Sequence, residues 1–302
     1  MPTEILEHFY NSDAVTINYA KGPPSGPPLV LLHGGSGRWQ NYMGIIPDLA
    51  AWFHLYAPDF RGHGRSGRVP GRYRLEDYAN DTFTFLRQNV ADPAVLFGSS
   101  LGGMVALMVA AQAPGDVRAV VVGDSPLTRR IDSWPRRNAA RAQVAAWRRL
   151  AGGRLSIDEI VEALKETPTE IPGQDEPVTM REKHGEDAGV FAWVATNLYY
   201  NDPDMLTAVL DGTMTAGYEM EKVLPAIRCP VLLLQADPDA GGMMTDAEVE
   251  RALPLLAHPR HVRFEQRSHA LFLPEKEPVL RALCDFFDSV AAVQTAGDRR
   301  VG

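Results

Sequence analysis

Cysteine is scarce in this sequence, with only Cys229 and Cys284 among 302 residues. The two lie far apart and form no CxxC pair, so the sequence predicts neither a disulfide framework nor a thiolate zinc site. Both are expected to be buried thiols in a reducing compartment. No run approaches the roughly 18 apolar residues of a membrane span, and no basic start precedes an apolar stretch near the N-terminus. We therefore expect a cytoplasmic protein that does not bind membranes.

An excess of positive charge is also missing, because the formal net charge is −8. Binding to the phosphates of a nucleic acid has no electrostatic basis in such a chain. The composition, 45% hydrophobic and 23% charged, is typical of a globular protein that is long enough for one large core and an insertion. The expected partner is a small-molecule substrate, and the composition leaves the oligomeric state open.

Short apolar runs recur along the chain, with helical stretches between them. They are rich in leucine or β-branched residues and do not alternate with polar residues, which is typical of strands covered on both faces. The sequence therefore predicts an α/β fold with a mostly parallel sheet. The runs occupy residues 14–20, 28–34, 53–59, 94–99, 117–124, 230–237 and 261–266.

This rhythm breaks between residues 125 and 225. The segments "RNAARAQVAAWRRLAGG" and "SIDEIVEALKE" have helical patterns, and "TPTEIPGQDEP" has the composition of a loop. We predict a helical cap at residues 125–225, inserted into a core domain formed by residues 1–124 and 226–290. The small, polar residues 291–302 are predicted to be a flexible tail.

The stretch "AVLFGSSLGG", residues 94–103, contains a G-x-S-x-G pattern centred on Ser100. Glycines flank Ser100 at positions 98 and 102, whereas Ser99 has no such neighbours. This spacing suits a tight strand-to-helix turn that holds the serine in a strained conformation and presents its hydroxyl above the sheet. The amide of Leu101, at the start of the following helix, would stabilise an oxyanion. Ser100 is the predicted nucleophile.

A serine needs a base to accept its proton. In turns of this type, the nucleophile, acid and base follow one another in that order along the chain, which leaves His258, His261 and His269. His258 and His261 lie at the beginning of a strand, but His269 follows its end in the loop "RSHALFLPE". Because reactive groups of parallel sheets gather beyond the carboxyl ends of the strands, His269 is the predicted base.

Three aspartates are candidates for the carboxylate that orients this histidine. Asp237 and Asp239 follow one predicted strand, and Asp124 follows another in "VVVGDSP". Asp239 is preferred, while Asp124 and Asp237 stay open as alternatives. The remaining two would be turn-forming aspartates.

A second oxyanion donor is expected from "LVLLHGGSGRWQN", where Gly34 and Gly35 follow a strand, and the amide of Gly35 is the candidate.

A dinucleotide-binding loop in this segment would need a glycine at position 40, but the residue there is Gln40. His63 is a single imidazole without convergent partners, and His33 is expected to form structural hydrogen bonds. We therefore predict neither a metal nor a cofactor.

These segments resemble the α/β-hydrolase superfamily. "HGGSG" is similar to its oxyanion loop, "PDFRGHGRS" to the turn after its fourth strand, "GSSLGG" to its nucleophile elbow and "RSHALFLPEKEP" to its histidine loop. The resemblance implies eight strands, a helical cap after the sixth, and a triad that includes Ser100 and His269. The family usually has a glycine three residues before the acid. Ala236 stands at that position here, and this alignment makes Asp239 the acid. A serine at position 100 argues against the members that use an aspartate nucleophile.

The resulting hypothesis is a serine hydrolase that cleaves a small, mainly apolar carboxylic ester or lactone through an acyl-enzyme. The alternatives are other Ser-His chemistry on the same fold (a carbon–carbon bond hydrolase, an aminopeptidase, a thioesterase or a cofactor-free lyase) and a non-catalytic ligand-binding module. Apolar side chains near the serine and on the cap would enclose the substrate. The predicted pocket residues are Gly34, Trp39, Met43, Trp134, Trp147, Trp193 and Tyr199.

Overall fold

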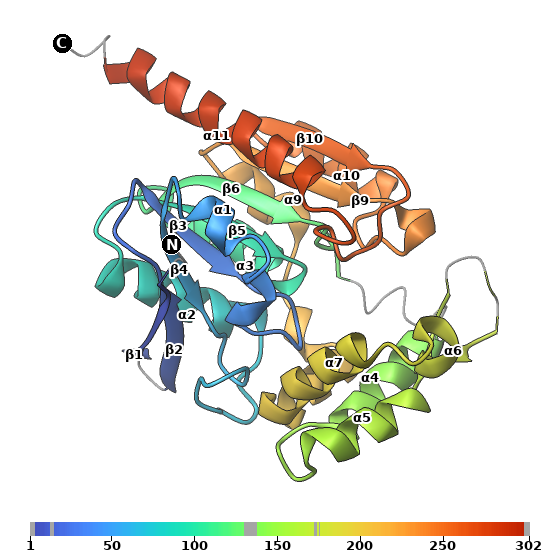
Figure 1. Cartoon of the computed structure of the whole chain (residues 1–302). Coiled ribbons are helices and arrows are strands. Elements are labelled where there is room, and N and C mark those ends of the chain that lie inside the picture. Colours follow the sequence, from blue (N-terminus) through green and yellow to red (C-terminus); the bar gives the residue numbers. More distant parts are fainter. Residues whose placement is uncertain (1–3, 13–14, 130–137, 172–173, 175, 299–302) are drawn as a thin grey trace.

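An eight-stranded sheet forms the centre of the protein (Figure 1). The computed structural model describes residues 4–12, 15–129, 138–171, 174 and 176–298. The strand order is β1-β2-β4-β3-β5-β6-β9-β10, and all pairs after β2–β4 are parallel. This confirms the predicted mostly parallel α/β sheet. The strands are β1 (Leu6–Ser12), β2 (Val15–Lys21), β3 (Pro28–Leu32), β4 (His54–Pro58), β5 (Ala94–Ser99), β6 (Val117–Gly123), β9 (Val231–Ala236) and β10 (Pro259–Phe264).

Strand β1 is the one member of the sheet that no apolar run predicted. It lies at the edge of the sheet. Among the described residues, it pairs only with β2, and the two strands are antiparallel. Most of its side chains are exposed, including Leu6 and Phe9. An edge strand that buries little apolar surface carries no continuous hydrophobic signal.

Helices cover both faces of the sheet, which explains why its central strands do not alternate with polar residues. In β3, Leu29 and Leu31 pack on the side of α1 and α11, whereas Val30 and Leu32 pack on the side of α2 and α3. The helices of this core are α1 (Ile46–Leu49), α2 (Leu75–Asn89), α3 (Leu101–Gln112), α10 (Asp246–Ala252) and α11 (Glu277–Asp298).

Among the described residues, six α-helices lie between β6 and β9 in the sequence, and Figure 1 shows α4, α5 and α7 grouped beside the sheet. Hydrogen bonds join this insertion to loops of the core. Arg38 Nε donates to Asn197 Oδ1 at 3.0 Å, and the Asp202 amide donates to the Gly62 carbonyl at 2.8 Å. The insertion contains α4 (Asn138–Leu150), α5 (Ile157–Lys165), α6 (Met180–His184), α7 (Ala188–Tyr200), α8 (Pro203–Leu210), α9 (Met220–Val223) and the short strands β7 (Pro168–Thr169) and β8 (Val178–Thr179).

Helix α11 extends to Asp298, beyond residue 291 where the flexible tail was predicted to begin. That boundary is corrected for residues 291–298, whose sequence "AAVQTAGD" is rich in alanine, the strongest helix former. Across the described ranges, no helix is both long enough and apolar enough to cross a lipid bilayer.

Candidate active site

Ser100 lies between the end of β5 and the start of α3, and its backbone has the unusual angles φ 54° and ψ −119°. Its amide donates to the Gly123 carbonyl of β6 at 3.0 Å. The flanking glycines make this turn possible. A Cβ atom on Gly98 would lie 2.1 Å from the Gly102 carbonyl oxygen, and one on Gly102 would lie 2.0 Å from that of Leu32. The turn therefore has the strand-to-helix geometry predicted around Ser100.

His269 pairs with Asp124 across the sheet edge, with Nδ1 of the imidazole 2.6 Å from Oδ2 of the carboxylate. The histidine follows β10, is partly exposed, and lies 145 residues further along the chain than the aspartate. Because an ionised carboxylate only accepts hydrogen bonds, Nδ1 carries the proton in this pair. The Nε2 atom is then left with a lone pair, as a general base requires.

Asp124 is completely buried and receives hydrogen bonds from three backbone amides as well as from His269. The amides of Ala236 and Met244 donate to Oδ1 at 3.2 and 3.1 Å, and that of Met243 donates to Oδ2 at 2.7 Å. Burial disfavours the charged form, but the bonds from His269, Met243 and Met244 outweigh it and lower the pKa of Asp124. The carboxylate is therefore held ionised and in a fixed orientation.

Backbone strain gathers at the same edge of the sheet. Among the residues that the structure describes, the non-glycine residues with positive φ are Ser36, Ser100, Asp124 and Gln266. Each follows the carboxyl end of a parallel strand: β3, β5, β6 and β10, respectively. Such conformations cost about 1–3 kcal/mol each and persist where the surrounding structure enforces them, which is common at functional sites.

The loop after β3 brings two glycines next to the serine turn. A Cβ on Gly34 would lie 3.9 Å from Ser100 Oγ, and a Cβ on Gly35 would lie 4.0 Å from Leu101 Cβ. Leu101 is the first residue of α3, so its N–H has no acceptor within the helix. The predicted oxyanion donors, the amides of Gly35 and Leu101, thus belong to neighbouring residues.

Buried His33 supports this loop from below. Its Nε2 accepts a hydrogen bond from the Phe60 amide at 2.9 Å, so its Nδ1 carries the proton and donates to the Gly34 carbonyl at 2.7 Å. Burial lowers the pKa of His33 to about 4. His33 is therefore a neutral structural residue, as the sequence indicated.

Met243 is a neighbour of Ser100 that sequence reasoning missed. The Ser100 hydroxyl donates to its sulfur at 3.8 Å, and the Met243 amide donates to Asp124. The only signal in the sequence is the pair of methionines in "AGGMMTD", shortly after a strand. This side chain presents an apolar thioether to the serine.

A family model described as the alpha/beta hydrolase fold matches residues 27–148. Two solved structures align with nearly the whole chain. E-2-(acetamidomethylene)succinate hydrolase has a TM-score of 0.72 at 20% identity, with 94% of this chain and 100% of that chain covered. The enol-lactonase from Burkholderia xenovorans LB400 has a TM-score of 0.70 at 16% identity, with 93% and 100% covered. The chain has the α/β-hydrolase fold.

A curated relative is similar over a shorter segment. The pimeloyl-[acyl-carrier protein] methyl ester esterase of Klebsiella pneumoniae (strain 342) is 41% identical over 108 residues. That segment covers 35% of this chain and 40% of the esterase, so the likeness extends over less than half of either protein. Together, these comparisons show the α/β-hydrolase fold and leave the substrate open.

Within this α/β-hydrolase fold, the partner of His269 differs from the preferred Asp239. Asp239 is exposed, and its amide donates to Asp237 Oδ1 at 3.0 Å. Asp237 also accepts from the Gln266 amide at 2.9 Å, and so fastens the end of β9 to the segment that leads to His269. The preference for Asp239 is corrected, because β6 lies directly beside β5 and brings Asp124 to the serine turn.

The predicted pocket residues occupy several environments. Trp39 is a correction: it is only 8% exposed, and its indole N–H donates to Glu7 Oε1 at 2.7 Å, so it packs in the core. Trp147 and Tyr199 are partly buried against the core cluster that includes the inserted helices, while Met43 and Trp193 are exposed. Trp134 lies outside the described residues. A Cβ atom on Gly34 would lie 3.9 Å from Ser100 Oγ, so this glycine is a neighbour of the serine.

Proposed function

We propose that this protein is a serine hydrolase that cleaves small, mainly apolar carboxylic esters or lactones. One observation carries the proposal: a serine with a strained backbone and a histidine lie at the same edge of the sheet. A buried carboxylate holds this histidine in a fixed orientation. A histidine whose Nδ1–H is held by a carboxylate has the tautomer needed to take a proton on Nε2. The names of an esterase and a lactonase among the similar proteins support this reaction class.

In the proposed first half-reaction, Ser100 Oγ attacks the carbonyl carbon of the substrate while its proton passes to Nε2 of His269. The negative charge that develops on the carbonyl oxygen is stabilised by the amides of Leu101 and Gly35. Each such donor contributes roughly 3 kcal/mol to the transition state. The tetrahedral species then collapses, and the departing alkoxide takes the proton from Nε2 to leave as an alcohol.

In the second half-reaction, a water molecule gives a proton to Nε2, and its oxygen attacks the acyl carbon. Collapse of the second tetrahedral species breaks the bond to Ser100 Oγ, which regains the proton from Nε2. The product is a carboxylic acid, or a hydroxy acid when the substrate is a lactone. Asp124 stabilises the imidazolium in both halves because its carboxylate stays ionised.

An apolar acyl group suits the surroundings of the serine. The sulfur of Met243 lies 3.8 Å from Oγ, and Gly34, which has no side chain, also lies next to the serine. A thioether is apolar and conformationally adaptable, and it accommodates alkyl groups better than charged ones. This surrounding favours a mainly apolar substrate.

The test uses p-nitrophenyl esters of short fatty acids with three proteins: wild type, Ser100→Ala and Ser99→Ala. The proposal expects hydrolysis by wild type and Ser99→Ala, and none above background by Ser100→Ala. A fluorophosphonate should form an adduct on Ser100 that mass spectrometry locates. Equal rates in wild type and Ser100→Ala would refute the proposal, while an adduct without ester turnover would favour other Ser-His chemistry. Absence of both would favour a binding module.

A further inference from the structure

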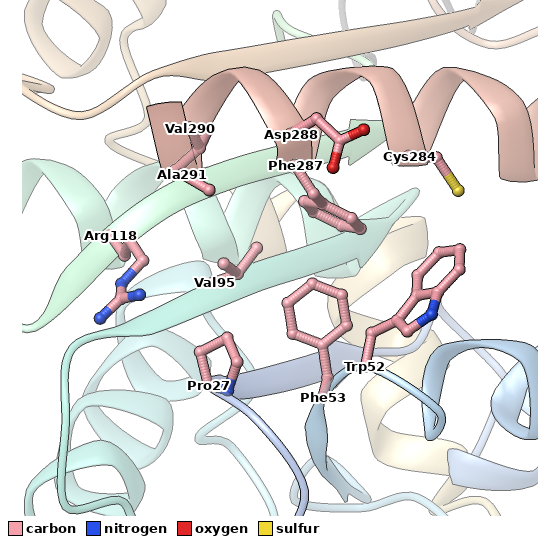
Figure 2. Close-up of a pocket in the computed structure, with 10 residues that line it drawn as sticks. All are labelled: Pro27, Trp52, Phe53, Val95, Arg118, Cys284, Phe287, Asp288, Val290 and Ala291. Atoms are coloured by element: carbon pink, nitrogen blue, oxygen red, sulfur yellow. The ribbon is translucent and has the colours of Figure 1, made fainter. Parts of the chain in front are cut away.

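A cavity of about 340 Å³ lies beneath the C-terminal helix α11, at the amino ends of the central strands. Figure 2 shows Val95 and Arg118 on two neighbouring strands, with α11 above them. Val95 is five residues before Ser100 on the same strand, a separation of roughly 17 Å at the usual rise per residue. The cavity is therefore separate from the candidate active site. Its lining residues are Pro27, Trp52, Phe53, Val95, Arg118, Cys284, Phe287, Asp288, Val290 and Ala291.

Most of this lining is apolar. Phe53, Phe287 and Val95 lie between the two ends of the cavity in Figure 2, and the rings of Phe53 and Phe287 are in edge contact at 4.8 Å between centroids. Trp52 lies near the outer end and is 53% exposed. A volume of this size is at the lower end of the range of small-molecule sites. The walls suit a single short alkyl chain or one aromatic ring.

Arg118 supplies a cation at the end of the cavity opposite Trp52. It is the second residue of β6, and its Nε is buried without a hydrogen-bond partner among the described residues. An unsatisfied buried donor destabilises the folded protein, so a ligand that accepts a hydrogen bond from it would remove that penalty. The guanidinium group matches a carboxylate in shape and charge, because both are planar and form paired hydrogen bonds.

Asp288 restricts the charge of such a ligand. It is exposed on α11, and Figure 2 places it along the helix between Val290 and Cys284, away from Arg118. A second carboxylate at the far end of a ligand would lie near this anion and be repelled. The cavity therefore favours one negative charge at Arg118 and an uncharged chain.

We infer that this cavity binds a free monocarboxylate with a short alkyl or aryl chain, its carboxylate on Arg118 and its chain against Val95, Phe53 and Phe287. The inference is independent of the proposed hydrolysis, since no residue of the cavity belongs to the candidate active site. It adds a second ligand site on the opposite edge of the sheet.

Cys284 provides a local readout, because its thiol lines the same cavity. Burial, together with nearby Asp288 and Asp285, raises the pKa of this thiol, so it is alkylated slowly at neutral pH. Burial raises the pKa of Cys229, the other cysteine, to about 11. Alkylation by iodoacetamide, followed by peptide mass spectrometry, reports on each thiol separately.

The experiment measures the rate of Cys284 alkylation with octanoate, octanedioate or octylamine present. At an octanoate concentration four times its Kd, mass action predicts a rate about fivefold lower than in buffer. Octanedioate and octylamine, which share the alkyl chain, should give little protection. Octanoate should not change the rate at Cys229. These comparisons use wild-type protein alone, so they do not depend on the folding of a variant.

A matched pair of variants then assigns the carboxylate to Arg118. Arg118→Gln should lose the protection by octanoate, whereas Arg281→Gln, which removes a charge from α11 outside this cavity, should retain it. Equal protection by octanoate and octylamine, or full protection in Arg118→Gln, would overturn the inference. The inference would also be overturned if Cys284 were alkylated more slowly at higher protein concentration but not at higher octanoate concentration, because a second copy of the protein would then cover the cavity.

Discussion

His269 and Asp124 are joined by a hydrogen bond of 2.6 Å between Nδ1 and Oδ2, although 145 residues separate them in the chain. The sheet brings them together. Asp124 directly follows Gly123, which is paired in the ladder with Ser99, so the aspartate and Ser100 leave adjacent strands at the same level. His269 reaches the carboxylate from beyond β10.

Replacing this carboxylate tests its role. Asp124→Asn should lower kcat for a p-nitrophenyl ester roughly 100-fold or more, because an amide no longer selects the Nδ1–H tautomer or stabilises the imidazolium. Asp239→Asn is the matched control and should stay near wild type, since Asp239 is exposed. A severe loss in Asp239→Asn with a mild one in Asp124→Asn would reverse the assignment made from the structure.

Met243 is expected to limit the size of the acyl group. Met243→Ala should raise the ratio of kcat/KM for p-nitrophenyl hexanoate over acetate by about 15-fold, because burial of two further methylene groups is worth about 1.6 kcal/mol. Met43→Ala removes a methionine that is 51% exposed and should leave the ratio unchanged. If only Met43→Ala alters the ratio, the acyl group lies against Met43 and not against Met243.

The serine turn should tolerate no side chain at its second glycine. Gly102→Ala places a methyl group 2.0 Å from the backbone oxygen of Leu32, which cannot rotate away. We expect the free energy of unfolding to fall by about 2 kcal/mol or more, as measured by urea denaturation. Gly115→Ala, with no atom within 4 Å of the added methyl group, should lose much less. Similar losses in both variants would show that the close approach does not matter.

Two buried histidines make stability depend on pH. Burial lowers the pKa of His33 to about 4 and that of His63 to about 3, whereas an unfolded chain titrates near 6.5. Between these values the unfolded state binds more protons, so stability is complete above pH 6.5 and falls as the pH falls. Each histidine should contribute a loss of about 2 kcal/mol between pH 7 and pH 5.

Urea titrations at pH 7 and pH 5 measure this effect. His63→Gln should reduce the difference in unfolding free energy between the two pH values by about 2 kcal/mol, because one of the two buried rings is removed. The exposed His8 offers the control, and His8→Gln should keep the wild-type difference. An unchanged difference in His63→Gln would mean that its ring is protonated in the folded protein.

The features predicted well from the sequence are those encoded locally. Continuous apolar runs marked the strands that are buried on both faces, and the glycine spacing marked the turn at Ser100, because each depends on neighbours only a few residues away. Strand β1 escaped notice because its exposed side chains leave no such run.

The features that depend on distant contacts were harder to predict. The choice between Asp124 and Asp239 depends on which strand lies beside β5, and strand order is a property of the whole sheet. Trp39 was expected in the pocket. Its indole N–H instead donates to Glu7, which lies 32 residues earlier in the chain, and no local pattern indicates that contact. Met243 was missed because nothing local shows that its loop crosses over the serine.

Adjacent β5 and β6 set the spacing of Ser100 and Asp124 through ladder hydrogen bonds, and the inserted helices begin only after that ladder ends. The excursion between β6 and β9 can therefore be lengthened, shortened or exchanged by evolution or by an engineer without altering that spacing. We expect the insertion to vary independently of the pair formed by Ser100 and Asp124.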